Sequence, residues 1–237
     1  KRKADAALRA KAMADPALAR TDPWDEIAKL QPVRKALYAP YYFEEVRAGF
    51  GSQLFDDARE IVRAAEEREK PNSERLPGYT DSRLPLLEKD LLDPRPVYPD
   101  LEREMLGFWL SKLRENLTAD AAGTKLFLGK ESPEALAARL IQTRLGNAGY
   151  RKQLWDGGLK AVKASTDPLI QYVLKTDPEA RAIRKDYENR VIGPTDRASE
   201  AIARARFAVY GTKVYPDATF TLRLSYGKVA GWTDNGV

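Results

Sequence analysis

Five Asp-Pro pairs constrain the fold of this chain more than any other feature of its sequence. Aspartate just before a helix accepts hydrogen bonds from the free amides of the first turn, and proline fits the first helical position because its missing N–H has no partner there. Each pair therefore predicts a boundary between elements, and the chain is expected to form a series of helices joined by short turns. The pairs are Asp15-Pro16, Asp22-Pro23, Asp93-Pro94, Asp167-Pro168 and Asp177-Pro178.

Between these pairs, apolar residues recur at the spacing of one helix face. A content of 43% hydrophobic and 32% charged residues is also typical of a globular, strongly helical chain. Two or three short helices are expected within 148–175, broken at Gly157-Gly158. The other predicted helices lie within 1–13, 23–38, 41–46, 52–69, 84–92 and 99–117, with one more opening at Ser132-Pro133.

The last helix is predicted to begin near Pro178. Its apolar positions keep helical register from Ile183 to Val209, across Gly193-Pro194. Because a loop at Pro194 would remove the reason for that register, we expect a kinked but continuous helix.

The C-terminal residues follow a different pattern. Residues 219–226 alternate between apolar and polar side chains, as in a half-buried strand, and Asn235-Gly236 is a hairpin signal. A single strand needs partner strands. The predicted fold is therefore mainly α, a multi-helix bundle over 1–211, with a C-terminal strand and half hairpin in 212–237 that belong to a missing β-domain. We interpret the sequence as a piece of a larger protein, cut at both ends.

The absence of two residue types excludes several chemistries. The chain contains no Cys and no His, which excludes disulfides, thiolate nucleophiles and a Ser-His-Asp triad within these residues. Its apolar runs fall far short of the roughly 18 residues that span a membrane. The sequence therefore predicts no catalytic residue, no cofactor, no metal site and no membrane contact for this chain.

The charge balance and the acidic pairs both indicate solvated helix faces. The net charge is +5, from 40 Lys and Arg against 35 Asp and Glu, and the two signs are interspersed along the helices. We favour this interpretation over a nucleic-acid binder, which should gather its cations on one side. Adjacent residues on a helix point about 100° apart, so neighbouring carboxylates seldom share a proton. We interpret Glu44-Glu45, Asp56-Asp57 and Glu66-Glu67 as surface carboxylates.

Five residues are candidates for lining a substrate cleft: Tyr41, Tyr42, Phe50, Arg59 and Arg63. The aromatic side chains can line a cleft or pack between helices, and packing is favoured. The two arginines lie one helical turn apart and can bind a carboxylate or peptide carbonyls. Ion pairs inside the bundle, to residues such as Glu60 or Glu67, are favoured for them.

The run 206–211, followed by 215–229, resembles the bacterial serine dipeptidyl-peptidase family that contains dipeptidyl-peptidases seven and eleven, serine peptidase family 46. The Tyr-Pro-Asp-Ala segment at 215–218 is its most specific part. The resemblance extends back through Gly49–Phe55 and Ala58–Arg63, and so covers most of the chain. One departure is Gly51, where relatives are expected to carry Asn.

The resemblance implies a chymotrypsin-like double β-barrel interrupted by a large helical domain. Residues 1–211 would be the helical cap domain, and 212–237 the first strand and hairpin start of the C-terminal barrel. The implied parent is a secreted or periplasmic serine dipeptidyl aminopeptidase whose catalytic residues lie outside this chain, and whose cap restricts cleavage to N-terminal dipeptides. Its implied partners are a peptide substrate, the rest of the polypeptide and a second copy of the parent. The alternative is a non-catalytic helical module for protein interaction.

Overall fold

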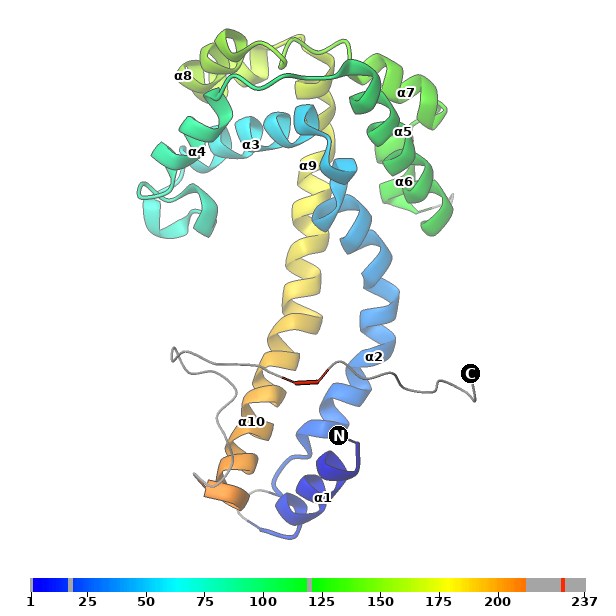
Figure 1. The fold of residues 1–237 in the computed structure, drawn as a ribbon, viewed down its shortest axis with the longest axis vertical. Helices are drawn as coiled ribbons and strands as arrows, with labels where there is room; N and C mark the ends of the chain where they lie inside the picture. The colour runs from blue at the N-terminus through cyan, green and yellow to red at the C-terminus, as the bar shows by residue number, and fades with distance from the viewer. Residues whose placement is uncertain (1, 17–18, 119–120, 212–226, 229–237) are drawn as a thin grey trace. The chain divides into compact units, whose positions relative to one another are not determined.

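The computed structural model describes residues 2–16, 19–118, 121–211 and 227–228, and it is mainly α-helical, as predicted (Figure 1). The predicted strand at 219–226 and the hairpin at 235–236 lie outside the described residues. Contacts divide the chain into two compact units. One combines Lys1–Trp24 with Ser199–Val237, and the other is Asp25–Ala198.

The first unit contains α1 (Arg2–Met13), the start of α2 (Pro23–Pro40) and the end of α10 (Gly193–Tyr210). Arg9 of α1 forms an ion pair with Asp22, and the other oxygen of Asp22 accepts a hydrogen bond of 3.2 Å from the amide of Trp24. The Lys11 ammonium lies 5.2 Å from the centre of the Tyr210 ring. The Asp22-Pro23 helix start is therefore confirmed, and its aspartate also binds α1.

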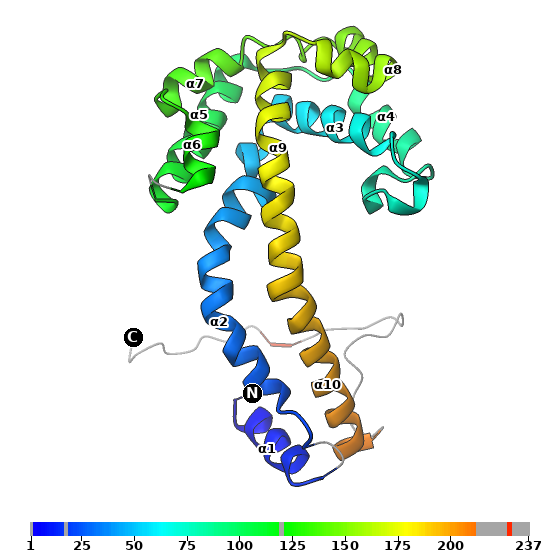
Figure 2. The same cartoon turned by 180° about the vertical axis from the view of Figure 1, so that it is seen from behind.

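In the second unit, α9 lies between two groups of helices, as both views show (Figures 1 and 2). One group contains α5, α6 and α7, and the other contains α3, α4 and α8. The elements are η1 (Tyr41–Val46, a π-helix), η2 (Ala48–Gly51, 3-10), α3 (Gln53–Glu67), η3 (Asn72–Glu74), η4 (Pro77–Tyr79), α4 (Leu84–Leu92), α5 (Pro99–Asn116), α6 (Ala122–Leu128), α7 (Pro133–Leu140), α8 (Ala148–Ala164), α9 (Pro168–Tyr187) and η5 (Glu188–Ile192, a π-helix).

Trp109 of α5 lies fully buried in the hydrophobic core of this unit. Its ring centroid is 4.9 Å from that of Phe55, 6.0 Å from Phe127 and 6.4 Å from Tyr172. Because these rings come from α3, α6 and α9, one side chain joins helices from both groups. Its indole N–H donates a 2.8 Å hydrogen bond to the carbonyl of Phe43, so the polar atom is also satisfied.

Most predicted helices are confirmed within a few residues, and the helix at 84–92 has the predicted bounds. The helix α6 was not predicted. It is only seven residues long and contains Gly123, so its sequence carries little periodicity. In α8, Gly158 departs from helical geometry with φ 57°, which agrees with the predicted break at Gly157-Gly158.

The predicted helix start near Pro178 is wrong. The helix α9 already begins at Pro168, shortly after α8 ends at Ala164, and Pro178 lies inside α9. Asp177 does not cap a helix, because its carboxylate accepts hydrogen bonds of 2.7 Å from Arg63 and 2.7 Å from Arg181. The bond from Arg63 comes from α3, whereas Arg181 lies one turn further along α9 itself. Both favour a continuous helix here and oppose the cost of a proline in its interior.

The predicted continuity across Gly193-Pro194 is confirmed, since α9, η5 and α10 follow one another without a loop. The amide of Gly193 donates to the carbonyl of Glu188, five residues back. In a regular α-helix, the Pro194 ring would meet the carbonyl four residues before it. A π-turn at this place widens the helix and relieves that contact. The kink itself stays a prediction.

Candidate functional site

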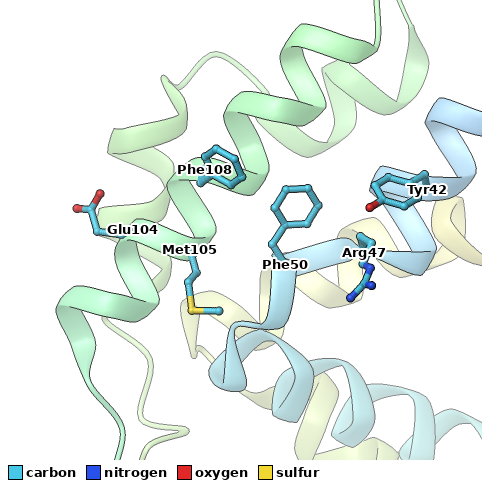
Figure 3. A pocket seen from close by; sticks show the side chains of 6 residues that line it. All are labelled: Tyr42, Arg47, Phe50, Glu104, Met105 and Phe108. Carbon is cyan, nitrogen blue, oxygen red and sulfur yellow. The ribbon is translucent and has the colours of Figure 1, made fainter. Parts of the chain in front are cut away.

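An aromatic pocket of about 450 Å³ lies where η1 and η2 face α5. Figure 3 shows the ring of Phe50 between Phe108 of α5 and Tyr42 of η1. The ring centroids of Phe50 and Phe108 are 5.6 Å apart. The full lining is Tyr42, Arg47, Phe50, Glu104, Met105 and Phe108, and we call these residues the aromatic pocket.

The pocket is built on a strained turn. Gly49, Phe50 and Gly51 have φ of 76°, 48° and 84°, and Phe50 is the only described non-glycine residue with positive φ. A side chain at Gly49 would place its Cβ 2.6 Å from the Phe55 ring. At Gly49 a glycine is therefore required, but Phe50 carries a side chain. A left-handed backbone conformation at a non-glycine residue costs roughly 1 kcal/mol or more. The strained backbone at Phe50 places its ring at the pocket.

Glu102 of α5 fixes the other end of this turn. One of its oxygens accepts hydrogen bonds from the Ser52 hydroxyl at 2.5 Å and the Leu54 amide at 3.2 Å, while the other accepts from the Gln53 amide at 3.2 Å. A carboxylate at this place satisfies the free amides of α3 and suits the positive end of its dipole. The two walls of the aromatic pocket are therefore joined directly.

A set of buried and partly buried charges joins η1, α3 and α9. The guanidinium of Arg63 binds Glu45 through two hydrogen bonds of 3.0 and 2.5 Å and Asp177 through one of 2.7 Å. Arg181 binds Asp177 at 2.7 Å and Glu67 at 2.6 Å. Burial disfavours the charge of Arg63, but its hydrogen bonds to Glu45 and Asp177 outweigh that effect and raise its pKa. We call these five residues the ion-pair cluster.

The prediction of surface carboxylates is therefore wrong for four residues, because Glu44, Glu45, Asp57 and Glu67 are all buried. Glu67 accepts from the nearby Lys70 and also from Arg181, 114 residues away, and Glu45 accepts from Arg63 of α3. The favoured interpretation of Arg63, an ion pair inside the bundle, is confirmed, but its partners are Glu45 and Asp177. Glu60 instead accepts a hydrogen bond from the Tyr79 hydroxyl.

The structure separates the five cleft candidates into two places. Tyr42 and Phe50 line the aromatic pocket. Tyr41 instead stacks on Tyr187, with ring centroids 4.1 Å apart and planes at 7°. Arg59 donates a 2.8 Å hydrogen bond to the carbonyl of Glu45, and the buried Arg63 belongs to the ion-pair cluster.

Four lining residues were not among the candidates: Arg47, Glu104, Met105 and Phe108. Met105 and Phe108 belong to the apolar positions on which the helix predicted over 99–117 depends. Phe108 is 55% exposed, whereas its neighbour Trp109 is fully buried. Adjacent residues on a helix point about 100° apart. In α5 the core side is taken by Leu106, Trp109, Leu110 and Leu113, which leaves Phe108 at the edge of the buried face.

Glu44 is a buried carboxylate next to this site. Its pKa is raised to about 7, first by burial and then by the charge of Glu179. Because the pKa of an unperturbed glutamate is near 4.5, the folded state binds a proton that the unfolded state releases between these values. Stability is therefore lost as the pH rises from about 4.5 to about 7.

Replacing Glu44 with Gln is expected to remove that loss. The variant should unfold at a higher temperature than the wild type at about pH 8, and the gain should shrink towards about pH 4, where Glu44 is protonated in both states. Thermal unfolding at several pH values measures this. Glu179→Gln removes only the like charge and should give a smaller gain in the same direction. A difference that does not depend on pH would contradict the assignment.

Among the residues that the structure describes, no group of three or more His, Cys, Asp or Glu side chains is placed to hold a metal ion. In the same residues, no helix combines the length and apolar character needed to cross a membrane.

Comparison with known proteins relates this chain to a family of peptidases. An Asp/Glu-specific dipeptidyl-peptidase of Shewanella putrefaciens is 28% identical over 205 residues, which cover 81% of this chain and 27% of that protein. The chain thus spans about a quarter of the length of this curated relative. The sequence also matches the family model described as peptidase S46, over residues 1–237. The resemblance stated from residues 206–229 is confirmed, and the chain belongs to the peptidase S46 family.

Proposed function

We propose that residues 1–211 form the helical domain that covers the peptide cleft of a serine dipeptidyl peptidase. The aromatic pocket carries this proposal. Strain at Phe50 is retained where the ring lines a concave apolar surface, and such strain is typical of ligand-binding sites. Family membership supplies the reaction class, peptide hydrolysis.

The proposed role is selective covering of the substrate. A domain that closes the cleft beyond two residues of the peptide would limit cleavage to release of dipeptides. Tyr42 and Phe50 would contact the peptide through their rings, with the charges of Arg47 and Glu104 at the same pocket. Tyr41, Arg59 and Arg63 would support this wall, because their partners lie within the helical unit.

The chemical step belongs to other residues of the proposed parent. This chain contains no His, so the general base of a serine peptidase has to come from elsewhere in the parent. We assign residues 212–237 to the first strand and hairpin of the C-terminal barrel. A periplasmic or secreted location and a homodimer of the parent are also part of the proposal.

The proposal predicts which substrates the full-length protein hydrolyses. Dipeptidyl coumarylamides with a free amino terminus, carrying acidic or apolar residues before the reporter, should be hydrolysed. The same compounds with an acetylated amino terminus should not. Equal hydrolysis of both sets would contradict a dipeptidyl peptidase. Binding of peptides without any hydrolysis would favour the helical interaction module instead.

Phe50→Gly tests the aromatic pocket. Glycine relieves the left-handed strain of roughly 1 kcal/mol and loses ring contacts of similar size, so the free energy of unfolding should change little. The missing ring should raise KM for dipeptidyl substrates on the order of tenfold. Leu86→Ala, which removes an exposed apolar side chain of α4 away from the pocket, is the control. An unchanged KM in Phe50→Gly would exclude Phe50 from the peptide site.

A further inference from the structure

The π-turn of η1 joins two residues of the aromatic pocket directly. The amide of Arg47 donates a 2.8 Å hydrogen bond to the carbonyl of Tyr42, five residues back. Both residues line the pocket. Any change in the geometry of this turn therefore changes the distance between two lining residues.

Side chains from other helices hold the turn in place. The carbonyl of Phe43 accepts from the Trp109 indole at 2.8 Å, and the carbonyl of Glu45 accepts from Arg59, also at 2.8 Å. The Glu45 carboxylate accepts hydrogen bonds from both terminal nitrogens of Arg63. Single π-turns are rare and often lie at functional sites, and here hydrogen bonds from α3 and α5 stabilise one.

Arg63 connects this turn to α9. Its Nε binds Asp177 at 2.7 Å while its two terminal nitrogens bind Glu45, so all three nitrogens are used within the protein. The side chain is only 6% exposed. Its forked geometry fixes both the distance and the angle between the turn and α9, which a single ammonium cannot do.

We propose that Arg63 is a positioning residue for the aromatic pocket. Through Glu45 it holds the π-turn, and through the turn it sets the positions of Tyr42 and Arg47, without contacting the peptide itself. This inference rests on the proposed function for its effect on catalysis, although its effect on the geometry of the turn is independent of that function.

Arg63→Lys and Arg181→Lys form a matched pair for the test in the full-length protein. Arg181 belongs to the same ion-pair cluster and binds Asp177 and Glu67, but none of its hydrogen bonds in the described residues reaches η1. Both substitutions keep the positive charge but replace the forked guanidinium with a single ammonium, so both should lower the unfolding temperature. Arg63→Lys alone should raise KM for a dipeptidyl coumarylamide, on the order of tenfold, with kcat within about twofold of the wild type.

A second measurement follows the geometry without activity. With 13C-labelled tyrosine, the ring resonance of Tyr42 should shift in Arg63→Lys and stay in place in Arg181→Lys. An unchanged KM in Arg63→Lys, or equal increases in both variants, overturns the proposal. If Arg63→Lys does not fold, Arg59→Met, which removes the donor to the Glu45 carbonyl, should raise KM in the same way, and an unchanged value overturns it.

The two ideas can fail separately. A wild-type protein that releases no dipeptides disproves the proposed function, and the Tyr42 resonance then decides the inference by itself. A Tyr42 resonance that does not move in Arg63→Lys shows that Arg63 does not set the geometry of the turn, whatever reaction the protein catalyses.

Discussion

Replacing Arg151 with Met is expected to destabilise the second unit by at least about 3 kcal/mol. Arg151 is 2% exposed, and its guanidinium donates to the carbonyls of Leu91 at 2.5 Å, Leu145 at 2.5 Å and Asp93 at 2.9 Å. Two of these carbonyls lie at the C-terminal end of α4, where a cation also suits the helix dipole. Methionine fills much of the volume but leaves three carbonyls without this donor.

Chemical denaturation of the wild type and the variant measures this effect. Lys152→Met is the matched control, because Lys152 is the next residue and its 3.0 Å pair with Asp156 lies at the surface, with 55% and 56% of the side chains exposed. Such an exposed pair contributes little to stability, because water and salt screen its charges. If Arg151→Met cost no more than Lys152→Met, the buried hydrogen bonds of Arg151 would not stabilise this unit.

Asp167→Asn is expected to cost about 2–3 kcal/mol, the second largest effect. The buried carboxylate accepts from the Thr143 hydroxyl at 2.7 Å and from the amides of Arg144, Leu169 and Ile170 at 2.8, 3.1 and 3.3 Å. It therefore caps α9 and holds the segment after α7 with the same group. Asparagine keeps the shape, but its NH₂ would face a donor on one side.

Ser132→Ala provides the comparison. Ser132 caps α7 with one hydrogen bond of 3.1 Å to the amide of Ala135, at an exposed position, so its loss should cost about 1 kcal/mol. Denaturant unfolding of both variants at the same pH measures the difference. Equal effects would mean that the bonds of Asp167 to Thr143 and Arg144 contribute nothing beyond an ordinary helix cap.

Local signals were enough to predict most helices. Pro99, Pro133 and Pro168 begin helices as expected, and Ser52 caps α3 through the amide of Phe55. These signals act over one or two helical turns, so they can be read without knowing the tertiary structure. Pro178 shows the limit, because the side chain of Asp177 has partners that outweigh the local preference.

The candidate site was predicted only in part, for a similar reason. Tyr42 and Phe50 were identified from an aromatic cluster, and both line the pocket. The partners of Arg63 could not be identified, since the sequence offers nearby acids at helical spacing while the true partners lie 18 and 114 residues away. Periodicity shows that a helix has a buried face, but the choice of partner depends on which helices meet.

The long separations in the ion-pair cluster also constrain how the second unit folds. Arg63 and Asp177 are 114 residues apart, as are Glu67 and Arg181. Closing such loops costs chain entropy before any contact is gained, so contacts of this range slow folding even in a helical protein. Removing Arg63 from water before its partners arrive is also unfavourable. We therefore expect the docking of α3 onto α9 to be a late, cooperative event. The aromatic pocket should then reach its final shape only after α9, the last helix to lie wholly within this unit, has docked.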